Sequence, residues 1–364
     1  MLYNAIRRKS RPVRVGKVVI GGEAPVAVQS MTNTDPHDFT ATSKQIRELE
    51  AAGCDVVRIT VPDSEAVDCI RYLRKEGISI PVVADIHFDY RLAIACAKAG
   101  YDKIRINPGN IGDESRVKEV CDACRERSIP IRIGVNSGSL EKNILKEYGA
   151  PTAEALCASA LYNLELCRRM GFEDAVVSIK SSDVYTMITA NRMLSAKSDC
   201  PIHIGVTEAG AGNSGLIKSA AGIGSLLCDG IGDTLRISLT DNPVREVEAA
   251  RQLLNSLNME GQKGLNIISC PTCGRTKIDL IDLVRRFEEA VRAEGLDRTD
   301  MTVALMGCVV NGPGEAAEAD VGVAGGSGEA SLFSHGKVLC KIPEDEIVPT
   351  LIRFIKENSK NTTE

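Results

Sequence analysis

Residues 82–107 show the pattern of a strand–helix–strand unit. They read Val82-Val-Ala-Asp-Ile-His-Phe-Asp-Tyr-Arg-Leu-Ala-Ile-Ala-Cys-Ala-Lys-Ala-Gly-Tyr-Asp-Lys-Ile-Arg-Ile-Asn107. Two β-rich runs, Val82–His87 and Lys103–Asn107, flank a stretch with helical periodicity, Tyr90–Ala99. Parallel strands need a long crossover connection, which is usually a helix. The segment therefore predicts one βαβ unit of an α/β fold.

The same alternation extends in both directions along the chain, after a hairpin-like stretch at Val13–Gly22. Strands are predicted at Val26–Met31, Val56–Val61, Val82–His87, Lys103–Asn107, Ile131–Asn136, Ala175–Lys180, Ile202–Thr207 and Thr234–Ser238. Helices are predicted at Ala41–Ala52, Ser64–Glu76, Tyr90–Ala99, Glu114–Arg127, Pro151–Met170, Asp183–Ser198, Gly215–Leu227 and Pro243–Leu257. Eight repeats are the number that closes a (β/α)₈ TIM barrel, with an open doubly wound sheet as the alternative.

Six of the predicted strands alternate polar and apolar residues. Because side chains alternate across a strand, the apolar set faces the helices and the polar set faces the barrel interior. Charged groups are costly in a barrel centre, so we expect them at the carboxyl-end mouth, where TIM-barrel active sites form. The polar pairs are Arg58 and Thr60, Asp85 and His87, Arg105 and Asn107, Arg132 and Asn136, Ser178 and Lys180, and Arg236 and Ser238.

Positive charge predominates at these strand ends, although the chain as a whole has a formal net charge of −5. Asp85 and Glu208 are the two obvious carboxylates available to balance the cations. Any one cation alone is typical of an ion-paired or solvated strand end. Together they predict a multiply anionic ligand such as a diphosphate, because guanidinium forks match phosphate oxygens. The cations are Arg58, Arg105, Arg132, Lys180 and Arg236.

The composition restricts the compartment and the class of partner. Thirteen cysteines, an odd number, do not suit a disulfide framework, and the first residues contain no long apolar run typical of a secretory signal. No segment approaches the ~18 apolar residues of a membrane span. We therefore expect a cytoplasmic protein that does not bind membranes. The net charge of −5 argues against nucleic acid as a partner.

Three cysteines near the C-terminus lie on glycine-flanked turns, in Cys270-Pro-Thr-Cys273-Gly and in Gly307-Cys308-Val-Val-Asn-Gly-Pro-Gly-Glu315. Three thiolates and one carboxylate form an incomplete thiolate cage, which favours an iron–sulfur cluster with a non-cysteine fourth ligand. A zinc site stays open as an alternative, although a zinc ribbon needs a second Cys-x-x-Cys or a His pair. Cys340 is a further candidate for the fourth ligand, but its surroundings are typical of a β-strand.

Seven motifs, in order along the chain, resemble the bacterial 4-hydroxy-3-methylbut-2-enyl diphosphate synthase family of the two-domain type. The similarity runs from Val13 to about Pro343 and implies a barrel at 1–261 followed by a smaller α+β iron–sulfur domain at 262–364. The motifs are Gln29-Ser-Met-Thr-Asn-Thr34, Ala84-Asp-Ile-His-Phe88, Arg105-Ile-Asn-Pro-Gly-Asn110, Arg132-Ile-Gly-Val-Asn-Ser-Gly-Ser139, Thr207-Glu-Ala-Gly210, Cys270-Pro-Thr-Cys-Gly-Arg275 and Gly307-Cys-Val-Val-Asn-Gly-Pro-Gly-Glu315.

The resemblance implies reductive ring opening and dehydration of 2-C-methyl-D-erythritol 2,4-cyclodiphosphate, with flavodoxin or ferredoxin as electron donor. It implies that Glu208 handles a proton. By motif match, a [4Fe–4S] cluster would be held by Cys270, Cys273, Cys308 and Glu315. The substrate would be bound by Arg58, Arg105, Arg132, Lys180, Arg236 and Ser238, with Asp85, His87 and Asn136 nearby.

The short linker Gly261-Gln-Lys-Gly264 predicts a head-to-tail homodimer. It follows the last barrel helix, whose end lies at the bottom of the barrel, and four residues at ~3.3 Å each do not reach the mouth. The cluster domain would then cap the barrel of a partner copy. Two other functions stay open: a pterin- or corrinoid-type barrel transferase with a structural zinc domain, and a zinc-knuckle module that binds nucleic acid or a partner.

Overall fold

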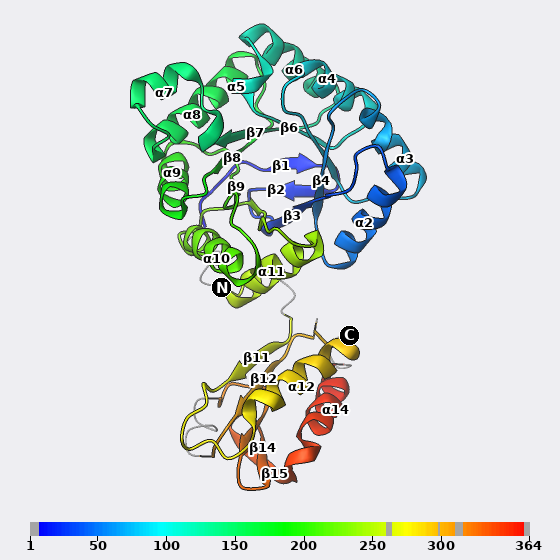
Figure 1. Cartoon of the computed structure of the whole chain (residues 1–364), viewed down its shortest axis with the longest axis vertical. Helices are drawn as coiled ribbons and strands as arrows, with labels where there is room; N and C mark the ends of the chain where they lie inside the picture. The colour runs from blue at the N-terminus through cyan, green and yellow to red at the C-terminus, as the bar shows by residue number, and fades with distance from the viewer. Residues whose placement is uncertain (1–6, 260–263, 298, 310–315, 360–364) are drawn as a thin grey trace. The chain divides into compact units, whose positions relative to one another are not determined.

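The computed structural model describes residues 7–259, 264–297, 299–309 and 316–359. The chain divides into two compact units, Met1–Glu260 and Gly261–Glu364, and each is described by itself (Figure 1).

Unit 1 is a parallel barrel, as the sequence predicts. Its eight strands are ordered β8-β7-β6-β5-β4-β3-β10-β9. The two ends of this sheet meet through a parallel bridge between Val177 and Ile202, where Val177 N donates to Pro201 O at 2.9 Å. The open doubly wound sheet is therefore wrong. The strands are β3 (Ala27–Met31), β4 (Val56–Thr60), β5 (Val82–Asp85), β6 (Lys103–Ile106), β7 (Ile131–Asn136), β8 (Ala175–Lys180), β9 (His203–Ile204) and β10 (Thr234–Leu235).

Helices surround the barrel in a ring (Figure 1). The segment predicted as one helix at Ser64–Glu76 is a 3₁₀ turn, η1 (Ala66–Asp68), followed by α3 (Cys69–Lys75). Two short helices that the sequence analysis did not predict, α5 (Pro108–Ile111) and α7 (Lys142–Tyr148), follow β6 and β7. The others are α2 (Phe39–Ala51), α4 (Tyr90–Ala99), α6 (Glu114–Glu126), α8 (Ala153–Arg169), α9 (Val184–Lys197), α10 (Gly212–Cys228) and α11 (Pro243–Ser256).

Polar N-cap residues fix where most of these helices begin. Each cap side chain accepts a hydrogen bond from a backbone N–H of the first turn, which has no partner within the helix. Such caps hold the loops between strand ends and helix starts, and so they position the mouth of the barrel. The capping residues are Asp38, Asp89, Asp113, Thr152, Asp183 and Asn242.

An antiparallel hairpin closes the other end of the barrel. It consists of β1 (Val13–Val15) and β2 (Val18–Ile20), and Figure 1 shows it inside the ring of helices. Val15 and Ile20 are fully buried. They pack against residues at the amino-terminal ends of the strands, Ala27, Val56 and Val83. This apolar plug leaves the carboxyl-end mouth as the open end.

Unit 2 is a mixed sheet with two helices against it. The strands are ordered β11-β12-β13-β14-β15, parallel as far as β13 and antiparallel from there. Leu283 and Phe287 on one helix and Leu351 and Ile355 on the other join the sheet in one apolar core. The elements are β11 (Asn266–Ser269), α12 (Leu280–Ala293), β12 (Thr302–Met306), β13 (Val321–Gly325), β14 (Glu329–Ser334), β15 (Lys337–Pro343), η3 (Glu344–Glu346) and α14 (Ile347–Ser359).

No helix in the described ranges is both long enough and apolar enough to traverse a bilayer. All thirteen cysteines lie in those ranges, and each is a free thiol.

Candidate active site

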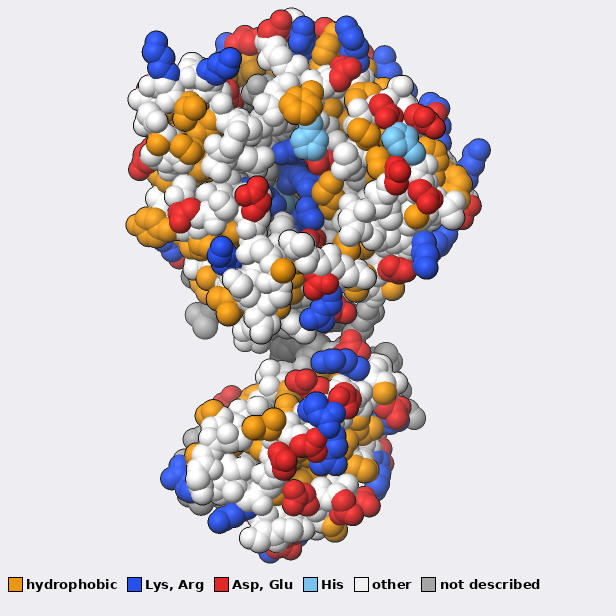
Figure 2. Space-filling view, viewed as in Figure 1, with side chains coloured by type: hydrophobic (Ala, Val, Ile, Leu, Met, Phe, Trp, Pro, Cys, Tyr) orange, Lys and Arg blue, Asp and Glu red, His pale blue; other side chains and the backbone are white. Residues whose placement is uncertain are grey.

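Five neighbouring strands, β4 to β8, bring most of the predicted substrate-binding cations into one place. Asp85 pairs with Arg105 across β5 and β6, and Arg105 pairs with Arg132 across β6 and β7, so the three lie at one level. Figure 2 shows unit 1 hollowed on the face in view, with Lys and Arg side chains at the bottom of the hollow. These side chains are not on an exposed rim, because Arg132 is 1% exposed and Lys180 is 8% exposed. The cations therefore lie buried at the bottom of the hollow and are not solvated strand-end residues.

Asp85 is the carboxylate around which the cations are arranged. Arg105 Nη1 donates to Asp85 Oδ1 at 3.0 Å, and Arg58 Nε lies 3.6 Å from Oδ2. His87 is exposed, with Nε2 at 3.8 Å from the same oxygen. Burial alone would raise the pKa of the Asp85 carboxyl, but the positive charges of Arg58 and Arg105 outweigh it and hold the pKa at about 2. Asp85 therefore stays ionised.

Arg236 is held by a carboxylate that the sequence analysis missed. Glu246 of α11 is 3% exposed and accepts from Arg236 Nε at 3.0 Å and Nη2 at 3.1 Å. The same carboxylate also accepts from Ser30 Oγ and Leu239 N, both at 3.0 Å. Glu246 therefore orients the guanidinium of Arg236 and leaves Nη1 directed toward Met31 Sδ at 3.5 Å.

Arg132 has hydrogen-bond donors with no acceptor. Its Nε and Nη1 are buried and have no partner among the residues that the structure describes, and the same is true of Arg105 Nε. Burial, followed by the neighbouring charges of Arg58 and Arg105, lowers the pKa of Arg132, and burial likewise lowers the pKa of Arg58 to about 10. Orphaned buried donors are costly in a folded protein, so they point to a ligand that supplies the acceptors.

Two glycines make room for these long side chains. A Cβ on Gly134 would lie 2.7 Å from Arg105 Nε, and a Cβ on Gly205 would lie 2.5 Å from the backbone oxygen of Arg236 and 3.0 Å from Lys180 Nζ. Burial and the charge of Arg132 lower the pKa of Lys180. The sequence analysis did not single out either glycine, since nothing in a strand pattern shows what lies across the barrel.

The remaining predicted site residues are at the mouth. Asn136 ends β7, and in the orientation that satisfies its neighbours its amide oxygen accepts from Arg105 Nη2 at 3.2 Å. Ser238 is half-buried beyond β10. Glu208 is exposed in the loop after β9 and has a φ of 52°. A bulky residue with positive φ is strained, and such strain concentrates at functional sites.

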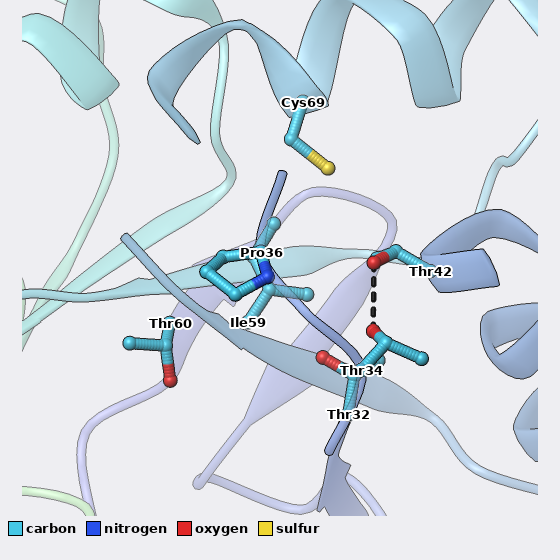
Figure 3. A pocket seen from close by; sticks show the side chains of 7 residues that line it. All are labelled: Thr32, Thr34, Pro36, Thr42, Ile59, Thr60 and Cys69. Atoms are coloured by element: carbon cyan, nitrogen blue, oxygen red, sulfur yellow. Dashed lines mark hydrogen bonds between the residues drawn. The ribbon is translucent and has the colours of Figure 1, made fainter. Parts of the chain in front are cut away.

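A small pocket lies beside this site, between the ends of β3 and β4 (Figure 3). Thr34 Oγ1 and Thr42 Oγ1 are hydrogen bonded across it at 2.7 Å. The pocket contains hydroxyl and apolar groups but no cation, so it is not a second anion site. Its lining residues are Thr32, Thr34, Pro36, Thr42, Ile59, Thr60 and Cys69.

The three predicted cysteine ligands follow two adjacent parallel strands of unit 2. Cys270 comes directly after β11, and Cys308 lies two residues beyond β12. Gly307 N donates to Cys270 Sγ at 3.2 Å, which is the kind of hydrogen bond that stabilises a thiolate. Cys273 is exposed, and the backbone N–H of Arg275 lowers the pKa of its thiol. The two turns touch, because Lys277 N donates to Gly307 O at 2.9 Å.

No three His, Cys, Asp or Glu side chains in the described ranges gather closely enough to hold one metal ion. Cys340 does not suit the fourth position. It lies on β15, level with Leu305 but three strands away, about 14 Å at normal strand spacing. The predicted fourth ligand, Glu315, is outside the described residues.

Comparison with known proteins identifies relatives along nearly the whole chain. The GcpE TIM-barrel domain matches residues 10–251, and the GcpE protein C-terminal domain matches residues 266–357. A protein of Fusobacterium nucleatum is 50% identical over 98% of this chain and 99% of its own length, and one of Geobacter sulfurreducens is 51% identical over 97% and 98%. Both are named 4-hydroxy-3-methylbut-2-en-1-yl diphosphate synthase (flavodoxin).

Among solved structures, a type I 3-dehydroquinate dehydratase from Clostridium difficile is similar to this chain. It is 15% identical with a TM-score of 0.51, and the match covers 68% of this chain and 98% of that protein. At this identity the similarity shows the barrel fold alone.

Proposed function

Because this chain belongs to the GcpE family, we propose that it carries out the reaction named for its relatives, the formation of 4-hydroxy-3-methylbut-2-en-1-yl diphosphate. The chain is an iron–sulfur oxidoreductase that opens the ring of 2-C-methyl-D-erythritol 2,4-cyclodiphosphate reductively, with loss of water. The observation that supports this most directly is the set of buried cations with unpaired Arg132 donors in the barrel. A multiply anionic substrate supplies the acceptors that these donors lack.

The cations bind the two phosphoryl groups and stabilise the charge that develops on the leaving phosphate oxygen. Arg132 and Lys180 are the least compensated cations and contact the phosphoryl oxygens, while Asp85 and Glu246 keep Arg105 and Arg236 oriented. Fixed donors of this kind need no rearrangement as charge develops, so they lower the barrier. Arg58 and Ser238 complete the ring, and Asn136 and His87 flank it at the mouth.

Cys270, Cys273, Cys308 and Glu315 hold a [4Fe–4S] cluster in unit 2. When bound, the cluster supplies single electrons at low potential and a Lewis-acidic iron. The backbone N–H groups near Cys270 and Cys273 stabilise the thiolates that the cluster requires. Glu315 is a weaker, exchangeable ligand by its carboxylate chemistry.

Glu208 supplies the proton for the departing hydroxyl. It is a carboxyl group on the loop after β9, in the sequence Thr207-Glu-Ala-Gly210, and its strained backbone holds it at the mouth. Gly210 in the same loop also has positive φ.

Flavodoxin is the electron donor, as the relatives' names state for those proteins, with ferredoxin as the second candidate. The enzyme works in the cytoplasm, where the ten cysteines that do not hold the cluster stay reduced. Its active unit is a head-to-tail homodimer in which each barrel is completed by the cluster unit of a partner copy.

The test is turnover of the cyclodiphosphate by anaerobically purified enzyme with reduced flavodoxin, together with assays for iron and sulfide. We expect about four irons per chain, a visible absorption band and product formation. Cys308→Ser should lose both the cluster and turnover. Colourless protein that contains zinc instead of iron would contradict the assignment of an iron–sulfur cluster.

A further inference from the structure

Lys103 lies beneath the cations of the site and has no part in the function proposed above. It is the first residue of β6 and precedes Arg105 by two positions, so both side chains point into the barrel, with Lys103 nearer the closed end. Its strand neighbour Val83 belongs to the apolar plug formed with the hairpin. Lys103 therefore lies between an apolar floor and a layer of guanidinium groups.

The side chain of Lys103 is fully buried and has almost nothing to neutralise it. Its exposure is 0%, and Nζ has the Gln29 Oε1 amide oxygen at 3.5 Å as its hydrogen-bond acceptor. A buried ammonium group needs a carboxylate or several acceptors, and burial without them favours the neutral amine. The one carboxylate among the groups facing it, Asp85, is already shared by Arg58 and Arg105.

Several cations face Lys103 across the barrel. The groups that face it from the other strands are Gln29 of β3, Arg58 of β4, Asp85 of β5, Arg132 of β7, Lys180 of β8, His203 of β9 and, around β10, Thr234 and Arg236. Burial first, and then the charges of Arg132 and Arg58, lower the pKa of Lys103 well below its ordinary value. His203 beside it is also fully buried, and its Nε2 has no partner within the described ranges.

We propose that Lys103 is an uncharged amine in the substrate-free barrel and takes up a proton when an anionic diphosphate binds above it. A bound dianion cancels the repulsion from Arg132 and Arg58, and that cancellation favours the ammonium form. Lys103 is thus a positioning residue that adds a positive charge beneath the substrate only when the site is occupied. The inference rests on the proposed substrate site and adds proton uptake to it.

Proton uptake on binding makes the affinity for the substrate depend on pH, and this dependence can be measured. If binding takes up a proton, affinity must weaken as pH rises, by up to about tenfold per pH unit when uptake is complete. The cyclodiphosphate suits the measurement, since each of its phosphoryl groups lacks a second ionisable hydroxyl and holds no proton near neutral pH. Without a reductant the enzyme binds the substrate but does not turn it over.

The experiment is calorimetric titration of the cluster-loaded enzyme with the cyclodiphosphate, at one pH, in buffers of different ionisation enthalpy. The slope of apparent enthalpy against buffer enthalpy counts the protons taken up. We expect the wild type to take up about one proton more than Lys103→Arg, whose guanidinium is already charged, and than Lys103→Met, which cannot be charged. Lys17→Met, an exposed lysine in the turn of the hairpin, should match the wild type.

Equal proton counts in the wild type and both Lys103 variants would overturn the inference while leaving the substrate site intact. If the variants do not fold, the wild type can still contradict the inference, because an affinity that does not weaken between pH 7 and pH 9 means that no proton is taken up. Absence of binding to the wild type would overturn both the inference and the proposed function.

Discussion

At the scale of single residues, the ability of the site to bind an anion depends on which of its cations are paired with a carboxylate and which are not. Arg236 is matched by Glu246, and Arg58 and Arg105 share Asp85, whereas no carboxylate in the described ranges forms an ion pair with Arg132 or Lys180. The compensated guanidinium groups are held in place, and the uncompensated ones are ready for a ligand. Asp85 thus stabilises the empty barrel while the site keeps its net positive charge.

Asp85→Asn tests this role through pH. The folded pKa of about 2 lies below the ordinary value of 3.8, so the ionised carboxylate stabilises the folded state above pH 4, and this stabilisation is lost as pH falls toward 2. We expect the variant to be less stable than the wild type by about 2 kcal/mol near neutral pH, with the difference shrinking below pH 4. Urea unfolding across pH 2.5–7 measures it.

Asp68→Asn is the matched control, because Asp68 pairs with Arg71 on the surface and both side chains are more than half exposed. It should change the free energy of unfolding by well under about 1 kcal/mol. A constant deficit for Asp85→Asn at every pH would contradict the explanation.

Gly134→Ala tests the space reserved for Arg105. The added Cβ would meet the guanidinium 2.7 Å away, and since that group is the end of a flexible chain, it should move rather than unfold the barrel. We expect affinity for the cyclodiphosphate to fall roughly tenfold, or about 1.4 kcal/mol, with little change in melting temperature.

Gly138→Ala provides the control for that substitution, because a Cβ there meets nothing within 4 Å. Both affinities are measured by calorimetry without reductant. Equal affinities for the two variants would mean that the position of Arg105 does not matter for binding.

At the scale of elements, the β1–β2 hairpin has a role that the strand–helix alternation does not show. It fills the amino-terminal end of the barrel with Val15 and Ile20, so the interior is closed from below. The buried charges above it are consequently separated from solvent on that side. A dry floor strengthens the electrostatic interactions of the site.

Ile20→Ala removes part of this plug. Ile20 is fully buried, so the substitution should leave a cavity and lower the free energy of unfolding by about 2–5 kcal/mol. Thermal unfolding monitored by circular dichroism measures the loss. Ile281→Ala on α12, where the side chain is 75% exposed, should stay within about 0.5 kcal/mol of the wild type. A similar small effect at Ile20 would show that the hairpin is not a structural plug.

At the scale of the whole molecule, the chain consists of two units with separate cores, and each carries half of the proposed chemistry. The cations lie in unit 1 and the cysteines in unit 2. Turnover needs both the cations and the cysteines. The central question is whether one chain or two chains supply the two sets of residues to each active site.

Co-expression of Arg132→Met with Cys308→Ser answers that question. In a head-to-tail dimer each mixed pair has one intact barrel facing one intact cluster unit, so random pairing should restore about a quarter of wild-type activity. Each variant expressed alone should be inactive. If every site is built within one chain, the mixture stays as inactive as its parts, and the dimer proposal is wrong.

The barrel and most of the residues that make up its interior could be predicted from the sequence. Strand periodicity depends on residues two apart and helix periodicity on residues three or four apart, so both can be read locally. Arg105 and Arg132 were predicted to face inward for that reason, and both are buried in the barrel. The assignment of Cys270, Cys273 and Cys308 as cluster ligands also came from local spacing, and it stays a prediction. The 3₁₀ break at Ala66–Asp68 and the short helix α7 were missed, because their patterns are too short to show a period.

Only the tertiary structure decided how deep the charges lie and what compensates them. Glu246 is on α11 and Gly205 follows β9, yet both act on Arg236 or Lys180, and no local pattern relates residues that meet only when a barrel closes. Lys103 follows the same period as Arg105, but its burial depends on the hairpin ninety residues earlier in the chain. Sequence determines which way a side chain points along a strand, whereas burial, charge compensation and protonation depend on the elements that the fold packs around it.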